Sequence, residues 1–558
     1  MAPGAAARSR RDHIDRCSDL SLRPSRVLES NSRIRAGPLE VIVAELLRPF
    51  AQAHPDEPAI IDERGASSWR ELNATTDRLA GALRGLGLDV GDAIAIHSGN
   101  RREHFELMCA AGHIGLRYVL VNWHWTADEL RYVLEDAGAK ALFSEADFAE
   151  IAATAADGLD LRARVAIGGA IPGFTPYEEF VASGPEGEPA GQSMGIPMIY
   201  TSGTTGRPKG VNRKLLAAGA PIEVAKLVGD TFAEILLIPE RGRSLLVGPV
   251  YHSAQWLWSQ VFLLTGRPVV MRRSFDAAET LRLIDEHAIT QIHLVPTQFV
   301  RLLRLEEKVR AAFDGSSLAA VWHGAAPCSP TVKRQMIEWL GPIVHEYYGS
   351  TEASVNTIIT ASEWLARPGS VGRPLPTTEV HVLREDGEPA KPGEPGQIWF
   401  RYTSGDDVEY WGDEAKTRSV HRPDGLFTTG DIGYFDEEGY LFLADRAIDM
   451  IISGGVNIYP AEVEGVLITH PAVRDVAVFG VPDDEFGEQV KAAVELAEEV
   501  NPSEGLATEL IAHCRASLAG YKAPRTVDFI EEMPRTPTGK LYKRLLRDPY
   551  WQGRGQRI

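Results

Sequence analysis

Cysteine is scarce in this 558-residue sequence, and the few cysteines form no recognisable site. They are far apart, without a Cys-x-x-Cys pair or a Cys/His cluster: Cys17, Cys109, Cys328 and Cys514. A disulfide framework and a structural zinc site are therefore not expected, and a reducing cytoplasm fits the chain. Cys328 lies beside a loop considered below, where a small buried thiol is the simpler interpretation and a catalytic cysteine the alternative.

The sequence also lacks long apolar runs and an excess of positive charge. No apolar run approaches the roughly 20 residues that cross a membrane. The net charge of −19 argues against a nucleic-acid partner, although local backbone amides and one or two cations can still bind an anion. At 558 residues the chain exceeds the roughly 250–300 residues of one hydrophobic core, so at least two domains are expected.

Residues 1–36 differ in composition from the rest of the chain. They are rich in arginine and poor in apolar residues, and no apolar segment of the kind found in secretory signals follows them. They also contain Asp12, Asp15 and Asp19, which argues against a transit peptide. We expect a disordered basic arm or an over-long start to the reading frame.

From about residue 40 the pattern alternates between helix and strand. Residues 39–50 and 101–115 have helical spacing, and residues 68–83 form a helix that Ser68 can cap with Glu71 in its first turn. Alternation of this kind predicts parallel sheets flanked by helices. The expected strands are residues 58–62, 92–97, 117–121, 245–250, 269–271, 291–295, 319–322 and 344–347.

The pattern changes twice towards the carboxyl end. Short strands at 378–383 and 396–402 among Gly, Pro and Asp turns indicate a small β-rich unit. A compact unit with helices 461–470 and 508–518 begins near residue 445, with strands at 473–479, 489–496 and 526–529. The predicted fold class is α/β: a large domain over 37–444, with mixed parallel sheets and a small β-rich subdomain, and a small α+β domain over 445–558.

The strongest local signal is the segment YTSGTTGRPKG at residues 200–210. Glycines let the backbone approach an anion, hydroxyls add donors, and Lys209 adds a charge, so a triphosphate is the expected guest. The segment is not a Walker A loop, because Gly210 follows Lys209 where a hydroxyl would hold magnesium. A flexible surface loop is the alternative.

Two further segments fit a nucleotide. HEYYGSTEA at 345–353 contains an aromatic pair that can stack on adenine, a threonine for a phosphate oxygen, and Glu352, whose hard oxygens suit Mg²⁺. GLFTTGD at 425–431 places Asp431 after a tight turn, where it can bind ribose hydroxyls. Taken alone, either segment is equally typical of a structural turn.

Two more segments complete the set. Residues 445–460 read DRAIDMIISGGVNIYP, and residues 534–540 read PRTPTGK and end at Lys540. In this order and at these separations, the five segments resemble the adenylate-forming superfamily of acyl-CoA synthetases, luciferases and peptide-synthetase adenylation domains. The resemblance covers the chain from about residue 40 to about residue 547.

The resemblance implies an active site between a large domain and a mobile carboxy-terminal domain, with ATP, Mg²⁺ and coenzyme A as cofactors. It assigns catalytic roles to Lys540, Thr351, Glu352 and His252. Magnesium binding is assigned to Glu352 and Thr204, and CoA binding to Ser453, Gly454 and Gly455. ATP or AMP is assigned to Thr201, Ser202, Gly203, Thr204, Thr205, Gly206, Lys209, Gly324, Ala325, Ala326, Tyr347, Tyr348, Gly349, Asp431 and Arg446.

The hinge departs from the family's pattern. Much of the family has Asp or Lys at a hinge position within Gly-Arg-x-(Lys/Asp)-Asp, whereas residues 445–449 read DRAID, with Ile448 at that position. An apolar hinge can shift the equilibrium between the two domain poses. An enzyme that only thioesterifies acyl-AMP made by a separate adenylating partner enzyme therefore stays open.

The sequence also indicates the chemical class of the carboxylic acid that the resemblance implies as substrate. By resemblance the acyl pocket contains His252, Trp256, His323, Gly324 and Ala353. Trp256 is either the gate of a fatty-acyl tunnel or a packing aromatic. Several stretches look most like FadD-type ligases of fatty, bile, steroid or terpenoid acids, and the small residues leave room for a bulky group. We therefore expect a large apolar monocarboxylic acid as the small-molecule partner.

Three other functions stay open at this point. A luciferase-like oxygenase shares the adenylating motifs, and an adenylation enzyme that loads a carrier protein is the stronger rival. A non-catalytic nucleotide-binding protein is disfavoured by the intact set of motif residues. Whether the chain forms a homodimer is also open.

Overall fold

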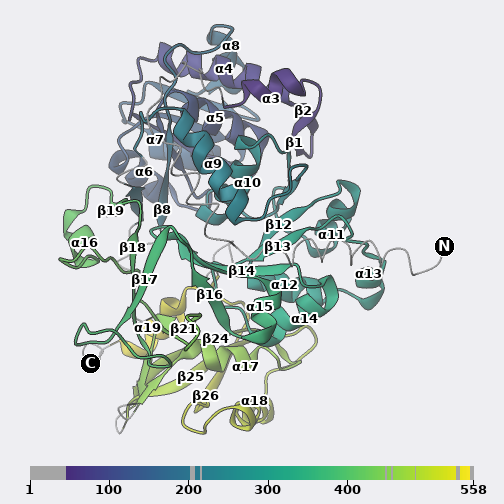
Figure 1. Ribbon diagram of the computed structural model, residues 1–558, viewed down its shortest axis with the longest axis vertical. Helices are drawn as coiled ribbons and strands as arrows, with labels where there is room; N and C mark the ends of the chain where they lie inside the picture. Colours follow the sequence, from purple (N-terminus) through teal and green to yellow (C-terminus); the bar gives the residue numbers. More distant parts are fainter. Residues whose placement is uncertain are drawn as a thin grey trace.

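The computed structural model describes residues 46–201, 208–213, 217–446, 449–453, 456–483, 486–535 and 541–552. Within these residues the strands form three sheets. Figure 1 shows elements of the first two sheets in the upper and middle parts of the molecule and the third sheet at the lower end. The basic arm expected at 1–36 lies outside the described residues.

One sheet is mostly parallel, as the alternating pattern predicts. Its strand order is β19-β9-β8-β4-β3-β5-β6-β7. The strands are β3 (Ala93–His97), β4 (Arg117–Leu120), β5 (Ala139–Glu145), β6 (Ala163–Ile167), β7 (Thr175–Pro176), β8 (Ile196–Thr201), β9 (Lys209–Arg213) and β19 (Val408–Tyr410). The neighbouring helices are α3 (Arg48–Ala53), α4 (Trp69–Gly85), α5 (Arg102–His113), α6 (Ala127–Asp136), η1 (Ala146–Phe148), α7 (Ala149–Ala156) and α8 (Tyr177–Ser183).

The largest sheet has the order β17-β18-β20-β21-β16-β15-β14-β13-β12-β10-β11-β1-β2. Its central strands β1, β11, β10, β12, β13 and β14 pair in parallel. In this half the strands are β1 (Pro58–Asp62), β2 (Gly65–Ser68), β10 (Ser244–Leu246), β11 (Val269–Met271), β12 (Gln291–Leu294), β13 (Ala320–His323) and β14 (Val344–Ser350). The accompanying helices are α9 (Glu223–Ile235), α10 (Ser253–Leu264), α11 (Ala277–Glu286), α12 (Pro296–Leu303), α13 (Glu307–Ala312) and α14 (Pro330–Leu340).

The β-rich segment expected after residue 372 has its own small core around Ile398 and Phe400, but it also continues the large sheet. Antiparallel pairing of β15 with β16 joins the two parts. The elements are β15 (Ser354–Ile359), β16 (Ser370–Pro374), β17 (Thr378–Leu383), β18 (Gly396–Tyr402), β20 (Asp431–Phe435), β21 (Leu441–Arg446), α15 (Ala361–Ala366) and α16 (Glu414–Ser419).

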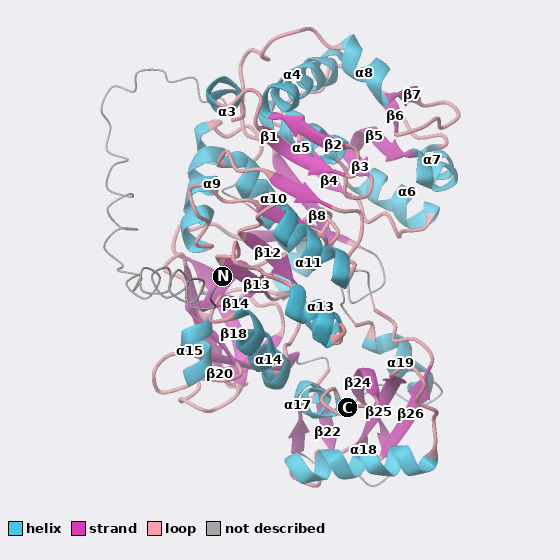
Figure 2. Ribbon diagram, turned by 90° about the vertical axis from the view of Figure 1, so that its right-hand side faces the viewer, coloured by secondary structure: helices cyan, strands magenta, loops and turns pink. Residues whose placement is uncertain are grey.

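The carboxy-terminal unit forms a separate lobe at one end of the molecule, with α18 along one face of its sheet (Figure 2). β22, β25 and β24 pair in that order, and β26 pairs β25. The elements are β22 (Ile451–Ser453), β23 (Val456–Ile458), α17 (Pro460–Leu467), β24 (Val473–Asp483), β25 (Gly487–Leu496), α18 (Glu504–Ser517), β26 (Thr526–Ile530) and α19 (Lys543–Trp551).

Local sequence signals account for many of the element boundaries. Ser68 caps α4: its hydroxyl accepts from the Glu71 backbone N–H, and the Glu71 side chain accepts in return. The predicted strand 245–250 ends early at Leu246, because residues 248–251 turn towards α10 instead. Of the helical spacing predicted over 39–50, the structure describes residues 46–50, in which the helix begins at Arg48 after Leu47 at its N-cap. No described helix is long and apolar enough to cross a membrane.

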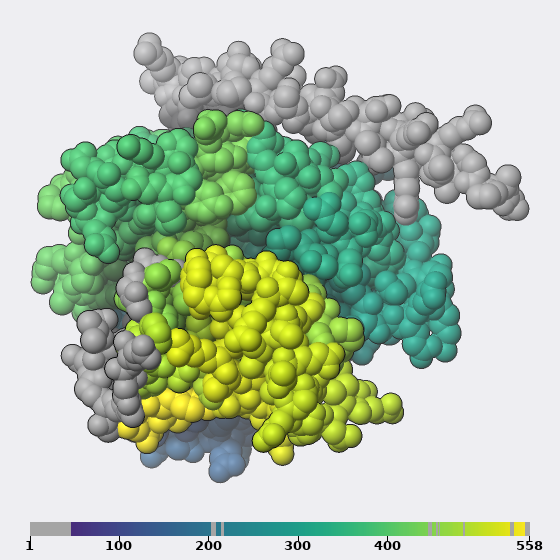
Figure 3. All heavy atoms as spheres, turned by 90° about the horizontal axis from the view of Figure 1, so that it is seen from below, coloured from purple at the N-terminus to yellow at the C-terminus, as the bar shows by residue number. Residues whose placement is uncertain are grey.

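Side-chain hydrogen bonds join the carboxy-terminal unit to the rest among the described residues. The Arg304 guanidinium donates to the backbone carbonyls of Val473 (2.6 Å) and Arg474 (3.3 Å), and the Ser329 hydroxyl donates to the carbonyl of Gly465 (3.3 Å). Figure 3 shows this unit, coloured lime to yellow, lying over the teal and green part of the molecule. A cleft lies between the two parts.

Candidate active site

The cleft has a volume of about 3230 Å³ and is lined by residues from both parts of the chain. The amino-terminal wall includes the ends of β8 and β14 and the start of α10, and the carboxy-terminal wall includes Leu541, Tyr542 and Lys543. All five sequence motifs contribute lining residues from the described parts of the chain. These segments, far apart in sequence, therefore share one cavity.

One end of the cleft is organised around Asp431, the first residue of β20. Its Oδ2 accepts hydrogen bonds from the Tyr348 hydroxyl (2.7 Å) and the Thr429 hydroxyl (2.8 Å). Tyr348 lies in β14, so two different strands hold this carboxylate in place. Asp431 also pairs with Arg446 across β20 and β21, although the Arg446 side chain is outside the described part of the structure.

The loop after β13 needs a glycine at its first position. A Cβ on Gly324 would lie 2.5 Å from the Tyr347 ring, so only glycine lets that ring pack against the loop. Ala325 follows with φ of +64°, in the left-handed region that non-glycine residues seldom adopt. Gly324, Ala325 and Ala326 all line the cleft, as do Tyr347 and Gly349.

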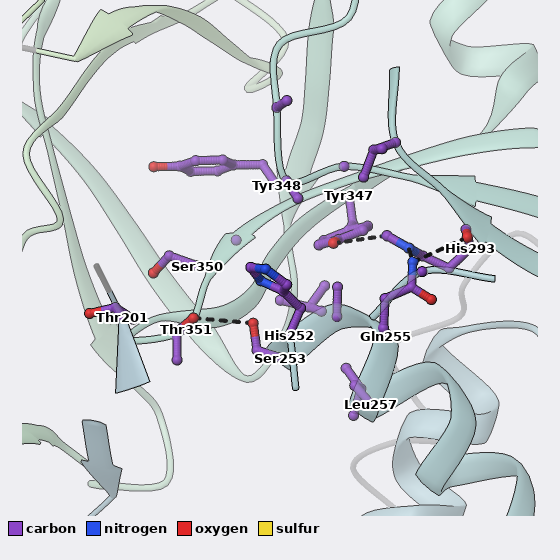
Figure 4. Close-up of a pocket in the computed structure, with 18 of the residues that line it drawn as sticks. Thr201, His252, Ser253, Gln255, Leu257, His293, Tyr347, Tyr348, Ser350 and Thr351 are labelled. Carbon is purple, nitrogen blue, oxygen red and sulfur yellow. Dashed lines mark hydrogen bonds between the residues drawn. The ribbon is translucent and has the colours of Figure 1, made fainter. Parts of the chain in front are cut away.

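Thr351 and Glu352 lie at the polar centre of the cleft. The Thr351 hydroxyl is 3.2 Å from the Ser253 hydroxyl at the start of α10 (Figure 4). The Tyr410 hydroxyl donates to Glu352 Oε1 at 3.3 Å. The Thr351 hydroxyl and the Glu352 carboxylate, from consecutive residues, therefore both line the cavity, and each has a hydrogen-bond partner, Ser253 for the first and Tyr410 for the second.

The glycine-rich loop is described only at its two ends. Thr201 ends β8 and Lys209 begins β9, and both line the cleft. Lys209 Nζ contacts Asp413 Oδ2 at 3.1 Å. The loop residues predicted between them lie outside the described residues: Ser202, Gly203, Thr204, Thr205 and Gly206.

Aromatic side chains dominate the wall next to α10. His252 precedes the helix and packs against Tyr251, with ring centroids 4.7 Å apart. Trp256 also lines the cleft, which leaves both of its sequence interpretations open, and Trp258 packs its ring 4.9 Å from that of Tyr347. Figure 4 shows His252 between the Thr351–Ser253 pair and Tyr347.

Of the three expected CoA residues the structure describes only Ser453, which is not among the residues that line the main cleft. Ser453 lines a smaller pocket of about 410 Å³ within the carboxy-terminal unit, together with Phe486, Tyr521 and two arginines. Gly454 and Gly455 lie outside the described residues. So do Lys540 and the hinge candidate Ile448, although Leu541, next to Lys540, lines the cleft.

Two residues assigned to the acyl pocket lie behind its wall instead. His323 is fully buried and packs edge-on against Phe299, 5.1 Å away, because its strand position points into the core. Ala353 is 1% exposed and belongs to the core of the β-rich segment. Neither is among the described residues that line the cleft, so both are corrected here to packing positions.

Cys328 lines the cleft as a free thiol. Desolvation raises the pKa of this thiol well above its usual value. Because the thiolate is the nucleophilic form, this position is unsuited to a catalytic cysteine, in line with the structural interpretation.

Three cleft residues, and one neighbour of the cleft, escaped the sequence analysis. Gln255, His293 and Tyr410 line the cleft, and Asp413 pairs with Lys209 beside it. Gln255 lies one turn after His252 on α10, and His293 lies near the carboxyl end of a predicted parallel strand. Those positions are the signals that could have identified them.

Comparisons with known proteins agree with this geometry. The model of the family "AMP-binding enzyme" matches residues 47–404, and that of the "AMP-binding enzyme C-terminal domain" matches residues 462–540. A fatty acid–[acyl-carrier-protein] ligase, ScoC, from Streptomyces coeruleorubidus is 31% identical over 91% of this chain and 96% of its own length. A feruloyl-CoA synthase from an Amycolatopsis species is 34% identical over 88% of this chain and 96% of its own.

A solved structure extends the likeness to the fold. The amide bond synthetase McbA from Marinactinospora thermotolerans superposes with a TM-score of 0.78 at 28% identity, covering 90% of this chain and 99% of that one. The matched family models, the relatives and the fold agree on the family. The chain belongs to the AMP-binding enzyme family, in the acyl-CoA synthetase class of the adenylate-forming superfamily that its five motifs resemble.

Proposed function

We propose that this protein is an ATP-dependent carboxylate–CoA ligase that adenylates a large apolar monocarboxylic acid and transfers the acyl group to CoA, releasing AMP and pyrophosphate. The acid is fatty or polycyclic, such as a steroid or terpenoid acid. The observation that carries the proposal is the single cleft that brings Thr201, Lys209, Thr351, Glu352 and Asp431 together beside an aromatic wall.

At the nucleotide end, Asp431 binds the ribose hydroxyls, because a carboxylate held by two hydroxyl donors is fixed in position before ATP arrives. Tyr348 presents its ring to the adenine, and the loop from Gly324 to Ala326 covers the other side. Arg446 adds a second ribose contact. Only an adenine nucleotide uses all of these groups together.

At the phosphate end, Thr201, Lys209 and the loop between them bind the β- and γ-phosphates. The donor set fits Mg²⁺, because Glu352 offers one carboxylate in the cleft and Mg²⁺ commonly combines one or two carboxylates with substrate phosphates. When bound, Mg²⁺ supplies positive charge that stabilises the phosphate oxygens. For Lys209 to bind a phosphate, its contact with Asp413 has to open or be shared.

In the first step a carboxylate oxygen of the acid attacks the α-phosphorus, and the bond from phosphorus to the pyrophosphate oxygen breaks. Both partners are anionic, so positive charge at this point lowers the barrier. Thr351 holds an α-phosphate oxygen, His252 orients the acid, and Lys540 supplies the charge. The product is the mixed anhydride, acyl-AMP.

In the second step the CoA sulfur attacks the acyl carbonyl, the bond to the AMP oxygen breaks, and the thiol proton passes to solvent. The pocket beside Ser453 supports CoA as the acceptor: Phe486 and Tyr521 offer aromatic faces for its adenine, and Arg515 and Arg525 offer charge for its phosphates. Because this pocket lies outside the main cleft, the carboxy-terminal domain over 445–558 has to rotate about the 445–449 hinge between the steps.

The test is to incubate the protein with ATP, Mg²⁺, CoA and a panel of acids, and in parallel with synthetic acyl-AMP and CoA, and to detect products by mass spectrometry. Acyl-CoA from free acid is the expected result, and the best acid identifies the substrate class. Acyl-CoA from acyl-AMP alone would contradict the first half of the proposal and direct the search to a separate adenylating partner.

A carrier protein is the second candidate acceptor, because ScoC, named as a ligase of fatty acids to an acyl carrier protein, matches 91% of this chain. Replacing CoA by a holo carrier protein in the same assay separates the two. Ile448→Asp is the hinge variant to include. A changed ratio of the two half-reactions is expected, whereas an unchanged ratio would show that the apolar hinge is harmless.

A further inference from the structure

Three polar side chains form a hydrogen-bonded chain inside the aromatic wall of the cleft. Gln255 Nε2 lies 2.9 Å from His293 Nδ1, and His293 Nε2 lies 3.1 Å from the Tyr347 hydroxyl (Figure 4). The three residues are 4%, 2% and 6% exposed, and all three line the cleft. Burying so many polar atoms in an otherwise aromatic wall is costly unless they have a use.

The surroundings are shaped to hold this chain. A Cβ on Gly248 would lie 2.4 Å from Gln255 Nε2, and a Cβ on Gly324 would lie 2.5 Å from the Tyr347 ring. The Trp258 ring packs 4.8 Å from His293 and 4.9 Å from Tyr347. Two glycines and one tryptophan therefore fix the positions of the polar groups.

The direction of the hydrogen bonds follows from the amide. Gln255 Nε2 also donates to the His293 backbone carbonyl at 3.4 Å, which can only accept, so the amide nitrogen faces His293. His293 Nδ1 therefore accepts. Desolvation lowers the pKa of His293 to about 3, so the ring is neutral and carries its one proton on Nε2.

His293 Nε2 consequently donates to the Tyr347 oxygen, and the Tyr347 O–H is left to donate elsewhere. No other partner for this hydroxyl is found among the described residues, and the side chain lines the cleft. The wall thus offers the Tyr347 hydroxyl as a donor that needs an acceptor.

We infer that the acid is a ring-bearing carboxylic acid with a hydrogen-bond acceptor, an ether or carbonyl oxygen, which the Tyr347 hydroxyl recognises. The inference rests on the proposed function, which it narrows. The wall around the Tyr347 hydroxyl is aromatic: the Trp258 ring lies 4.9 Å from the Tyr347 ring, and Trp256 also lines the cleft. Aromatic faces pack well against a flat ring, which favours a ring-bearing acid.

The experiment compares isosteric acids that differ only in the acceptor: 4-methoxybenzoate against 4-ethylbenzoate, and 3-methoxybenzoate against 3-ethylbenzoate. For each pair kcat/KM is measured by acyl-CoA formation, and Kd by calorimetry on the acid alone. The wild-type protein is expected to favour the methoxy acid of at least one pair by roughly tenfold, because the ethyl acid leaves a buried hydroxyl unpaired.

The variants are Tyr347→Phe, Gln255→Met and the control Tyr177→Phe, a buried tyrosine whose hydroxyl bonds Glu106 outside the cleft. The ratio of kcat/KM for the methoxy acid to kcat/KM for the ethyl acid is taken within each variant, so a general loss of activity or stability cancels. Tyr347→Phe is expected to bring the ratio to about one. Gln255 is a positioning residue, so its variant is expected to lower the ratio part of the way, and the control is expected to keep it.

A wild-type ratio near one in both pairs, or a ratio that survives Tyr347→Phe, would overturn the inference. So would the absence of binding by all four acids. Turnover with no methoxy preference would leave the ligase function standing while removing this inference. A methoxy preference in binding without any acyl-CoA formation would contradict the ligase function and support this inference, so the two failures are distinguishable.

Discussion

The two walls of the cleft are held in different ways. The amino-terminal wall is tied together by side chains from several elements, as in the bonds Tyr348–Asp431, Thr351–Ser253 and Tyr347–His293. Among the described residues, Arg304 and Ser329 donate hydrogen bonds to backbone carbonyls of the carboxy-terminal part. The first wall is therefore fixed by bonds between side chains, whereas these contacts to the second wall bind its backbone.

The buried ion pair behind the amino-terminal wall gives the largest expected effect on stability. Lys333 is fully buried, and its Nζ lies 2.6 Å from Glu346 Oε2, on the strand that carries Tyr347 and Tyr348. Lys333→Met should lower the free energy of unfolding by about 3–5 kcal/mol, because it leaves Glu346 buried without its partner.

Urea unfolding followed by tryptophan fluorescence measures this loss. The matched control is the double variant Lys333→Met with Glu346→Leu, which removes both charges and should recover most of the stability. A single variant within about 1 kcal/mol of wild type would mean that this wall does not depend on the pair.

Lys540→Ala tests the opposite wall. If Lys540 supplies charge only in the adenylating pose, ATP–pyrophosphate exchange should fall by about 10²- to 10³-fold, while thioester formation from synthetic acyl-AMP changes little. Lys543→Ala is the control, since Lys543 Nζ is paired with Glu464 at 2.9 Å and should matter less. Equal losses in both half-reactions would remove the proposed role of Lys540.

Asp431→Asn probes the nucleotide end of the organised wall. Loss of the charged acceptor should raise KM for ATP by roughly 10- to 100-fold, with a smaller effect on kcat. Tyr348→Phe keeps the ring and removes the Tyr348 hydroxyl bond to Asp431 while the Thr429 bond stays, so its effect should be weaker. Steady-state kinetics with varied ATP decide the matter, and an unaltered KM in Asp431→Asn would exclude a ribose contact.

Arg304→Ala should give the smallest effect of the four. It removes the hydrogen bonds to Val473 and Arg474 that favour the present pose, so the ratio of the adenylation rate to the thioesterification rate should change a few-fold. Measuring both half-reactions on one preparation gives the ratio. An unchanged ratio would show that these contacts do not set the pose.

Local patterns predicted much of the fold. Alternating helices and strands gave the parallel sheets, and Ser68 with Glu71 marked the start of α4. The pattern could not show that β16 joins the β-rich segment to the large sheet, since strand pairing at long range leaves no local trace. The end of α17 at Leu467 rather than at residue 470, and the extra length of β24 and β25, also differ from expectation.

The motifs located the cleft but not all of its wall. Thr351, Glu352 and Asp431 were identified because they stand in recognisable segments, and the structure brings them together. His323 and Ala353 were placed in the pocket, yet His323 is turned into the core by its strand, and Ala353 packs into the core of the β-rich segment from the turn between β14 and β15. Gln255 and His293 meet only in space, 38 residues apart, which no single sequence pattern reveals.

The most direct test of the ligase account follows an oxygen atom. The protein is given ATP, CoA and an acid labelled with ¹⁸O at both carboxylate oxygens, and the AMP formed is analysed by mass spectrometry. If the carboxylate attacks the α-phosphorus and CoA then breaks the acyl carbon–oxygen bond, each AMP carries one ¹⁸O. Unlabelled AMP, or label in inorganic phosphate formed with ADP, would contradict an acyl-adenylate in this cleft.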